Sequence, residues 1–262
     1  MADQQLPDSA RVVVIGGGII GCSVAYHLAE EGCDVVLLER DQLTSGTTWH
    51  AAGLLTNFGS GSETLLDIRK HARNLYDRLE HETGQQTGFV GSGFIELAAD
   101  EDRVEEYRRI AAFNRLHGND IHELSAAEIK DLFPLADVDD IKAGFYAEHD
   151  GRINPVDVTM AMAKGARMKG AKLIEKTPIR KVLTSNGAVS GVRTDRGDIR
   201  CEFVVNCAGM WARQLGEQNG VVIPNQAAEH YYLITESIEG ITKDLPVLED
   251  PSKYAYYREE TG

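Results

Sequence analysis

The amino-acid sequence predicts an α/β fold, α+β over the whole chain, in which a parallel sheet and an antiparallel sheet are built from interleaved segments. Two continuous apolar runs, 11–15 and 34–39, flank a glycine cluster and an apolar pattern of helical period. Such runs are typical of strands buried on both faces, and a strand–helix–strand unit implies parallel pairing. Beyond residue 178 the apolar residues recur with a period of two, which indicates antiparallel strands.

The first two helices are predicted from apolar residues that lie three or four positions apart. The first helix is expected to end at Gly32, and its apolar face is formed by Ile20, Val24 and Leu28. A longer helix begins near residue 65, and its expected apolar face is formed by Leu65, Ile68, Ala72, Leu75 and Leu79.

The middle of the chain contains one strand pattern and two helix-start signals. Segment 93–99 alternates as a strand does. Ser125 and Glu128 have the spacing of a capping box at the start of a short helix. Asn154 followed by Pro155 predicts an N-cap and an N1 proline, so another helix begins there.

The last third of the chain predicts mainly strands. A three-stranded meander is expected at 179–185, 188–194 and 199–206. Asn186-Gly187 is typical of a two-residue hairpin turn between the first two of these strands. A further strand is expected at 230–236, and residues 254–262 have the pattern of a strand that enters a turn.

Composition excludes several kinds of partner. The formal net charge is −14, from 27 Lys and Arg against 41 Asp and Glu, so neither nucleic acid nor an anionic membrane is expected to bind. The four cysteines include no CxxC pair and no metal-finger spacing, so we expect free thiols, no metal site and a reducing compartment. No apolar run is long enough to span a membrane, and no signal or transit sequence is evident. The expected location is the cytoplasm, or the mitochondrial matrix for a eukaryotic protein whose transit peptide has been removed.

A glycine motif follows the first predicted strand. Gly16, Gly18 and Gly21 form G-x-G-x-x-G between a strand and a helix, which is the context of a dinucleotide-binding turn. We expect Gly16 to permit the turn, Gly18 to let backbone approach a pyrophosphate, and Gly21 to let helix and strand pack closely. The N–H groups at the helix start would face the phosphates. A glycine-rich turn without a ligand is the alternative.

The end of the second predicted strand narrows the choice of dinucleotide. Glu39 lies where a carboxylate can accept hydrogen bonds from ribose hydroxyls. Arg40 is a candidate contact for the 2′-phosphate of NADP, but the carboxylate of Glu39 would repel that phosphate. NADP is therefore disfavoured, and NAD and FAD share the motif.

Four segments resemble the D-amino-acid-oxidase-type flavoenzymes, and within them the sarcosine and dimethylglycine dehydrogenase/oxidase branch. These segments are 12–40, 93–98, 150–173 and 203–212. The resemblance implies a Rossmann-like FAD-binding domain of the glutathione-reductase type, with an interleaved antiparallel-sheet substrate domain. It also implies that FAD is the cofactor.

The same resemblance divides the chain into alternating parts. The FAD-binding domain is expected at 1–84 and 151–222, and the substrate domain at 85–150 and 223–262. The resembling enzymes continue beyond the point where these residues end. The sequence is therefore expected to be a fragment or an unusually short relative.

The segment "TSGTTWHAAG" (44–53) carries the narrowest part of the resemblance. In the sarcosine and dimethylglycine branch it runs beside the isoalloxazine ring, and the histidine that matches His50 is bonded covalently to the flavin 8α-methyl carbon. The resemblance therefore implies a covalent link through His50, with Trp49 packed so as to orient the imidazole. Read alone, a histidine in such a loop is a hydrogen-bonding or exposed residue. The residues implied to contact FAD here and at the helix start are Ile19, Ile20, Ser45, Gly46, Thr47, Thr48, Trp49, His50, Ala51, Ala52, Gly53 and Leu54.

Two further parts of the chain are implied to approach the flavin. The small-residue turn at Ala208 and Gly209 follows a buried strand, and in the resembling enzymes its backbone lies against the cofactor. Trp211 is either part of this surface or an aromatic residue that packs inward at a helix start. Val182 matches a position whose backbone contacts the adenine end, while its side chain is expected to belong to the core.

The candidate catalytic residues also follow from the resemblance. His230 matches a histidine near the substrate amine, and Tyr256 or Tyr257 matches a tyrosine of the same pocket. An amine is oxidised as the free base, so an imidazole or phenol beside it would set its protonation state. Arg258 is a candidate partner for the substrate carboxylate. Alternatively, these aromatic residues simply pack in a core.

The resulting functional prediction is an FAD-dependent oxidoreductase that oxidises the C–N bond of dimethylglycine or sarcosine and releases formaldehyde. Oxygen or an electron-transfer flavoprotein would be the electron acceptor. Two alternatives remain open at this point. One is an oxidoreductase with non-covalent FAD that acts on another amino acid or a 2-hydroxy acid, and the other is a truncated, inactive flavin-fold module.

Overall fold

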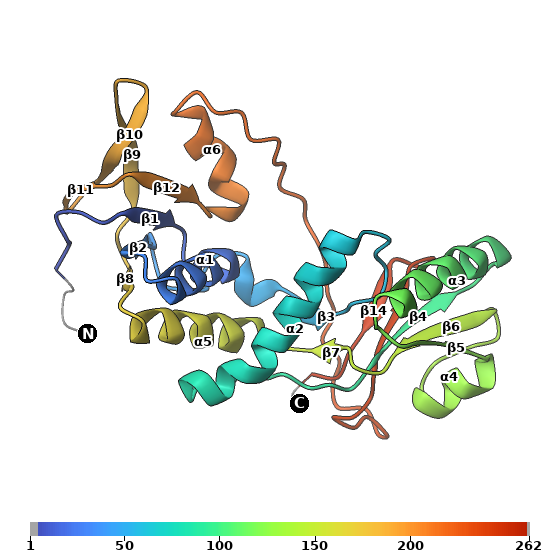
Figure 1. Cartoon of the computed structure of the whole chain (residues 1–262). Coiled ribbons are helices and arrows are strands. Elements are labelled where there is room, and N and C mark those ends of the chain that lie inside the picture. The colour runs from blue at the N-terminus through green and yellow to red at the C-terminus, as the bar shows by residue number, and fades with distance from the viewer. Residues whose placement is uncertain (1–4, 261–262) are drawn as a thin grey trace. The chain divides into compact units, whose positions relative to one another are not determined.

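The computed structural model describes residues 5–260 and divides the chain into two compact units, each assembled from three segments (Figure 1). The first unit contains Met1–Ala52, Arg78–Thr87 and Asn154–His230, and the second contains Gly53–Asp77, Gly88–Ile153 and Tyr231–Gly262. Because neither unit is continuous in sequence, the residues of one site can come from distant parts of the chain.

The first unit is built on a four-stranded parallel sheet, which confirms the predicted fold class. Its strands lie in the order β12 (Phe203–Asn206), β1 (Val12–Ile15), β2 (Val35–Leu38) and β8 (Lys172–Ile174). Every residue of β1 and β2 is buried, as continuous apolar runs predict. The carboxyl ends of these parallel strands meet at one edge of the sheet, where ligands of such folds bind.

Two helices, α1 (Ile19–Glu30) and α5 (Pro155–Met168), pack side by side in the first unit (Figure 1). A Cβ atom added at Gly165 of α5 would lie 2.7 Å from the ring of Tyr26 in α1, so the close packing depends on this glycine. The predicted start of α5 is confirmed, because the Asn154 side chain accepts two backbone N–H groups of the first turn.

The predicted apolar face of α1 is wrong. Ile20 is 64% exposed, and Val24 and Leu28 are only partly buried. The buried residues are Gly21, Cys22, Ala25, Tyr26 and Ala29. Small side chains let α1 approach its neighbours closely, and this close packing overrides the apolar periodicity.

An antiparallel meander completes the first unit. Its strands are β9 (Ile179–Ser185), β10 (Ala188–Thr194) and β11 (Gly197–Arg200), and the predicted Asn186-Gly187 turn joins the first two. The meander and the parallel sheet share one core, which includes Val13, Ile15, Val36, Leu38, Val182, Val192 and Ile199. The single strand predicted at 199–206 is wrong, because the chain leaves the meander after β11 and pairs β12 with β1 instead.

The second unit contains a five-stranded mixed sheet. Its strands lie in the order β14 (Ala255–Tyr257), β13 (Val247–Asp250), β4 (Phe94–Ala98), β6 (Ala143–Ala147) and β5 (Ile121–Leu124). A separate pair of short strands, β3 (Leu54–Leu55) and β7 (Gly151–Arg152), is antiparallel. The central strand β4 confirms the strand predicted at 93–99.

Helices cover both faces of the mixed sheet. On one face, α3 (Glu101–Leu116) places Tyr107 against the rings of Phe58 and Phe145. On the other, α4 (Ala126–Leu132) belongs to a cluster that contains Ile95, Leu97, Leu124, Ile129 and Phe133. The capping box predicted at the start of α4 is present, since Ser125 and Glu128 bond to each other's backbone N–H groups.

The long helix predicted from residue 65 is α2 (Glu63–Thr83), but its expected face is partly wrong. Leu65 and Ile68 are 50% and 58% exposed, whereas Leu66 is fully buried. Leu75 and Leu79 are buried as expected. The buried residues therefore follow the expected stripe only in the second half of the helix, and Leu66 replaces Leu65 and Ile68 in its first turns. No helix in the described part of the chain is long and apolar enough to cross a membrane.

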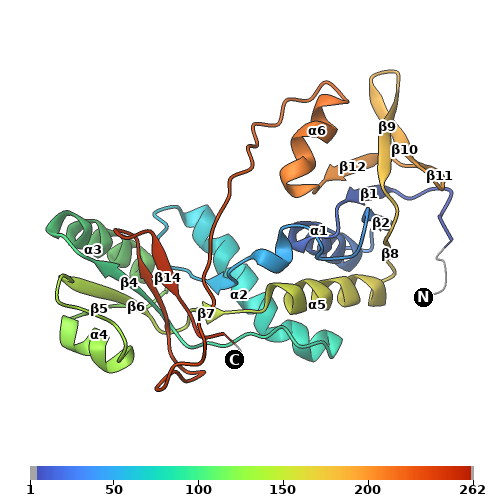
Figure 2. The same ribbon diagram turned by 180° about the vertical axis from the view of Figure 1, so that it is seen from behind.

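The strand predicted at 230–236 is not formed. Residues 221–246 contain no helix or strand (Figure 2), and Tyr231 and Leu233 are 86% and 87% exposed. An extended segment needs a neighbouring strand to bond its N–H and C=O groups, and apolar alternation does not supply that neighbour. By contrast, the strand predicted near residue 254 is present as β14.

Candidate functional site

Close backbone contacts require glycine at two positions of the motif between β1 and α1. Gly16 has a φ angle of +109°, and a Cβ atom there would lie 2.4 Å from the carbonyl oxygen of Cys207. A Cβ atom at Gly21 would lie 1.9 Å from the carbonyl oxygen of Gly16. The two glycines thus allow the residue after β12 and the first turn of α1 to pack closely against the turn.

Glu39 holds this turn with its carboxylate. Its Oε2 accepts the N–H of Gly17 at 2.6 Å, and its Oε1 accepts the N–H of Asp41 at 2.9 Å. A carboxylate oxygen accepts more than one hydrogen bond, so both oxygens retain capacity for ribose hydroxyls. The position of Glu39 at the carboxyl end of β2 therefore fits the ribose of a dinucleotide.

The N-terminus of α1 is partly occupied by the segment that carries His50. Gly18 is the N-cap residue, and the N–H of Ile19 donates to Oγ1 of Thr48 at 3.0 Å. Among the described residues, the N–H of Gly18 has no hydrogen-bond partner. Such an N–H group at a helix start is suited to a phosphate oxygen.

The loop 44–52 lies against the glycine turn. Thr44 has a left-handed φ of +71°, and its N–H donates to the carbonyl oxygen of Gly17 at 2.9 Å. A short 3₁₀ helix, η1 (Thr48–His50), follows. A non-glycine residue with positive φ is strained, and such strain persists only where the surroundings fix it. The contact with the glycine turn fixes it here.

The Trp49 and His50 side chains are in contact with each other. Their ring centroids are 3.5 Å apart at an interplanar angle of 35°. Both residues are exposed, Trp49 by 53%, so the imidazole is accessible to a ligand. The same loop contains the exposed residues Ser45, Thr47 and Ala51 and the partly buried Gly46 and Ala52.

The turn after β12 meets this loop from the other side. Asn206 holds the turn, since its side chain accepts the N–H of Ala208 and donates to the carbonyl oxygen of Ala212. Trp211 closes η2 (Gly209–Trp211), and its ring lies beneath the guanidinium of Arg40 and beside Gly46. The first unit therefore places Ala208, Gly209, Arg40 and Trp211 together with the glycine turn.

Other residues implied by the resemblance lie elsewhere. The Val182 side chain is 7% exposed and belongs to the core of the first unit, so only its backbone is available. Gly53 and Leu54 belong to the second unit, where the carbonyl oxygen of Gly53 accepts the N–H of Ile153 at 2.8 Å. Ile20 is exposed at the first turn of α1.

The candidate catalytic residues fall in both units. His230 is exposed and ends the last segment of the first unit. Tyr256 and Tyr257, on β14 of the second unit, are 46% and 52% exposed. Arg258 donates to the carbonyl oxygen of Ile153 at 3.2 Å and pairs with the nearby Glu260 carboxylate. Their joint role in one pocket stays a prediction.

Some residues that shape the site give no signal in the sequence. Glu175 lies 132 positions from Leu43, yet its Oε1 accepts the N–H of Leu43 at 2.7 Å. Lys176 and Thr177 donate their N–H groups to the carbonyl oxygens of Asp41 and Glu39. These contacts fix the chain that leaves β2, and they depend on the pairing of β2 with β8.

The thiols near the turn do not form a reactive or metal-binding group. Cys22 is fully buried, and burial raises the pKa of its thiol to about 12. Burial also raises the pKa of Cys207. Among residues 5–260, no cluster of three or more His, Cys, Asp or Glu side chains is arranged to hold a metal ion.

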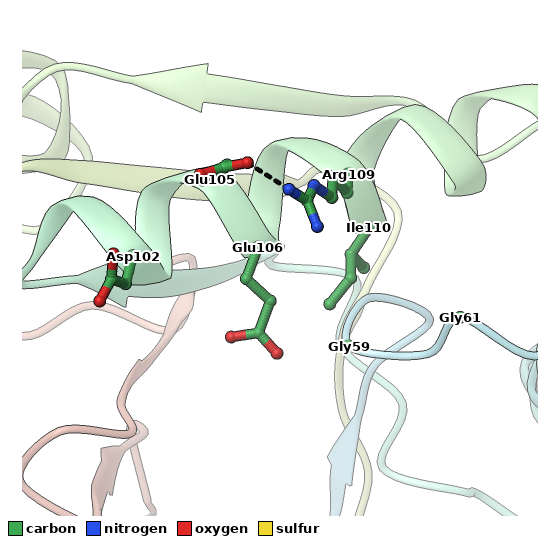
Figure 3. Close-up of a pocket in the computed structure, with 7 residues that line it drawn as sticks. All are labelled: Gly59, Gly61, Asp102, Glu105, Glu106, Arg109 and Ile110. Atoms are coloured by element: carbon green, nitrogen blue, oxygen red, sulfur yellow. Dashed lines mark hydrogen bonds and ion pairs between the residues drawn. The ribbon is translucent and has the colours of Figure 1, made fainter.

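A cavity of about 540 Å³ lies in the second unit, between α3 and the loop that carries Gly59 and Gly61 (Figure 3). Its wall includes Glu105, which pairs with Arg109, and the carboxylate of Glu106. None of the residues expected from the sequence to bind FAD or substrate lines it. The cavity is lined by residues of the second unit.

The glycine turn, the Glu39 carboxylate at the end of β2 and the parallel sheet form the arrangement that is typical of dinucleotide-binding α/β units. The profile of the FAD dependent oxidoreductase (DAO) family matches residues 11–262. The chain belongs to this family.

The chain is also similar to two named dehydrogenases and to one solved structure. Human mitochondrial sarcosine dehydrogenase is 42% identical over 260 residues, which are 97% of this chain and 28% of the relative. Mitochondrial dimethylglycine dehydrogenase of Rattus norvegicus is 41% identical over 257 residues, with 97% and 30% covered. The crystal structure of L-proline dehydrogenase from P. horikoshii matches with a TM-score of 0.84 at 26% identity, over 96% of this chain and 67% of that one. The chain thus spans less than a third of the two dehydrogenases named first.

The residues of the first unit fit the cofactor named by the family. Gly18 offers an N–H group at a helix start, Glu39 retains acceptor capacity at the ribose position, and His50 is exposed beside the turn. The glycines also leave no side chain in the path of a pyrophosphate.

Proposed function

We propose that the protein is an FAD-dependent oxidoreductase that oxidises the C–N bond of a small N-methylated amino acid, such as sarcosine or dimethylglycine. The convergence of the glycine turn, Glu39 and the His50 loop in one unit carries this proposal. Membership of the FAD dependent oxidoreductase family and similarity to two dehydrogenases named for these substrates support it. The names of both relatives also favour a mitochondrial matrix location if the protein is eukaryotic.

The first unit would hold FAD along the edge of its parallel sheet. Gly18 and the start of α1 would bind the pyrophosphate, Glu39 would accept the ribose hydroxyls, and the turn at Ala208 would lie against the ring system. His50 would tether the flavin through a bond from a ring nitrogen to the 8α-methyl carbon. Bound FAD supplies the chemistry of hydride acceptance from the substrate N-methyl carbon.

The protein's own residues would control the protonation of the substrate. The amine loses hydride only as the free base, so His230 and one of Tyr256 and Tyr257 would accept or hold its proton. The resulting N-methylene iminium ion takes up water and divides into formaldehyde and the demethylated amine. Electrons would leave to oxygen or to an electron-transfer flavoprotein.

Intact mass spectrometry of the purified protein and of His50→Ala tests the cofactor and its attachment together. We expect an adduct of the mass of FAD that persists under denaturation and is absent from His50→Ala. His149→Ala, in an exposed histidine of the second unit, is the matched control and should keep the adduct. FAD that is released by denaturation of the unmodified chain would contradict the covalent link and leave a non-covalent flavoprotein.

Anaerobic mixing with substrate tests the reaction itself. Sarcosine or dimethylglycine should bleach the flavin absorbance, and one formaldehyde should form for each flavin reduced. A purified protein without flavin colour, even after incubation with FAD, would refute the proposed activity for this length of chain.

A further inference from the structure

Thr48 connects the His50 loop to the start of α1. Its side chain is turned away from solvent, and the residue is only 7% exposed. Oγ1 of Thr48 accepts the N–H of Ile19, the first residue of α1, at 3.0 Å. Gly18 makes this approach possible, because a Cβ atom there would lie 3.0 Å from the same oxygen. Gly18 of the motif therefore leaves room for a side chain of the loop.

The hydroxyl of Thr48 can serve two partners at once. A hydroxyl accepts through its lone pairs and donates its own proton, so acceptance from Ile19 leaves the proton of Thr48 for another acceptor. The N–H of Gly18 lies at the same helix end, where anions are stabilised. A phosphate bound there would be within reach of both the helix and the loop.

The contact lies close to His50 along the chain. The N–H of Ala51 donates to the carbonyl oxygen of Thr48, and the N–H of His50 donates to that of Thr47, both at 3.1 Å. The first half of the loop has a separate contact, from the N–H of Thr44 to the carbonyl oxygen of Gly17. The Thr48 hydroxyl is therefore placed to control η1 rather than the whole loop.

We infer that Thr48 is a positioning residue, which anchors η1 to the helix end that binds the pyrophosphate and thereby sets the place of the His50 imidazole. This inference rests on the proposed function for its consequence, the attachment of FAD. Its physical basis, the hydrogen bond between loop and helix, is a property of the protein without flavin. The hydrogen bond and its effect on FAD attachment can be tested separately.

Hydrogen exchange of the flavin-free protein tests the anchor. Thr48→Val keeps the side-chain shape and removes the acceptor, whereas Thr48→Ser keeps the hydroxyl. We expect peptides that cover 47–54 to exchange about fivefold to tenfold faster in Thr48→Val, the factor that loss of one hydrogen bond gives. Thr48→Ser and the distant control Thr184→Val, an exposed residue of β9, should exchange as the unmodified protein does. Unchanged exchange of 47–54 in Thr48→Val would overturn the inference.

The rate of covalent FAD attachment, followed by mass at saturating FAD, tests the consequence. Thr48→Val should attach FAD about tenfold more slowly than Thr48→Ser, since a loosened η1 presents His50 less often. A Thr48→Val variant that binds FAD weakly but attaches it at the unmodified rate once saturated would also overturn the inference, because Thr48 would then only contact phosphate.

The outcomes separate this inference from the proposed function. If the unmodified protein forms no covalent adduct, the proposed attachment fails, and the exchange experiment still decides whether Thr48 anchors η1. Exchange of β1 peptides in each variant shows that the fold is retained. Should Thr48→Val not fold, Thr48→Ala compared with Thr48→Ser gives the same contrast between the absence and presence of the hydroxyl.

Discussion

The guanidinium of Arg40 lies 3.8 Å from the centroid of the Trp211 ring, and the contact joins the carboxyl end of β2 to the turn after β12. Because β1 lies between these two strands in the sheet, the pair spans the glycine turn. Trp211 is 36% exposed, so the contact is only partly shielded from water. The pair links the two chain segments that flank the glycine turn.

Loss of the Arg40 cation should lower the stability of the protein by a small but measurable amount. We expect Arg40→Leu to lower the unfolding free energy by about 0.5–1 kcal/mol, the range of partly exposed cation–π contacts. Arg40→Lys should retain part of this. Urea unfolding is the measurement, with Arg200→Leu, an exposed arginine without a described side-chain partner, as the control. Equal midpoints for both leucine variants would show that the contact does not contribute.

A methyl group at Gly21 should disrupt the glycine turn. Its Cβ atom would lie 1.9 Å from the backbone oxygen of Gly16, so the start of α1 must move. We expect Gly21→Ala to lower the unfolding free energy by about 1–3 kcal/mol, as overpacking does. Gly61→Ala is the matched control, because a Cβ atom there meets no atom within 4 Å. Thermal unfolding measures both, and comparable melting temperatures would contradict the described packing.

Removal of the Asp150 carboxylate should destabilise the second unit. Asp150 is 1% exposed, and its oxygens accept the backbone N–H of Asn57 at 2.7 Å and the Asn57 side-chain N–H at 2.6 Å. Hydrogen bonds to charged groups are strong, so Asp150→Ala should cost about 3 kcal/mol in urea unfolding. Asp67→Ala, in an exposed residue of α2, should leave the midpoint unchanged.

Glu96 should make the stability of the protein fall as the pH rises. Burial raises its pKa from 4.5 to about 7. Glu249, which lies opposite Glu96 on the neighbouring strand β13, also raises this pKa. The folded state therefore binds this proton more tightly than the unfolded chain, so its stabilising effect is complete below pH 4.5. It is lost progressively up to about pH 7, a change of about 3 kcal/mol.

The variant Glu96→Gln isolates this group. The difference in unfolding free energy between the unmodified protein and Glu96→Gln should move in favour of Glu96→Gln between about pH 4.5 and pH 7 and stay constant above. Glu123→Gln is the control, since Arg108 lowers the pKa of this exposed carboxyl instead. A pH-independent difference for Glu96→Gln would refute the raised pKa.

The sequence predicts the parallel unit well because its signals are local. Buried strands show as continuous apolar runs, and the start of α5 is visible in Asn154 and Pro155. The buried face of α1 is not predictable in this way. Packing of small residues against a neighbouring helix decides it, and that neighbour lies more than a hundred residues away along the chain.

The candidate site, too, is only partly predictable from the sequence. The glycine motif, Glu39 and the loop 44–53 can be found from spacing and resemblance. The contact between Leu43 and Glu175 cannot, because it exists only once β2 and β8 are paired. The segment 230–236 is the opposite case. Its alternating pattern predicts a strand, but the described residues provide no strand beside it.

Both tryptophans of the chain, Trp49 and Trp211, lie around the glycine turn, one beside His50 and the other beneath Arg40. Indole emits light in the near ultraviolet, where a flavin absorbs. A flavin bound at this edge would take up the excitation energy of both rings at short range. The intrinsic emission of the protein is therefore an optical gauge of occupancy, bright without flavin and dim with it, that needs no added label.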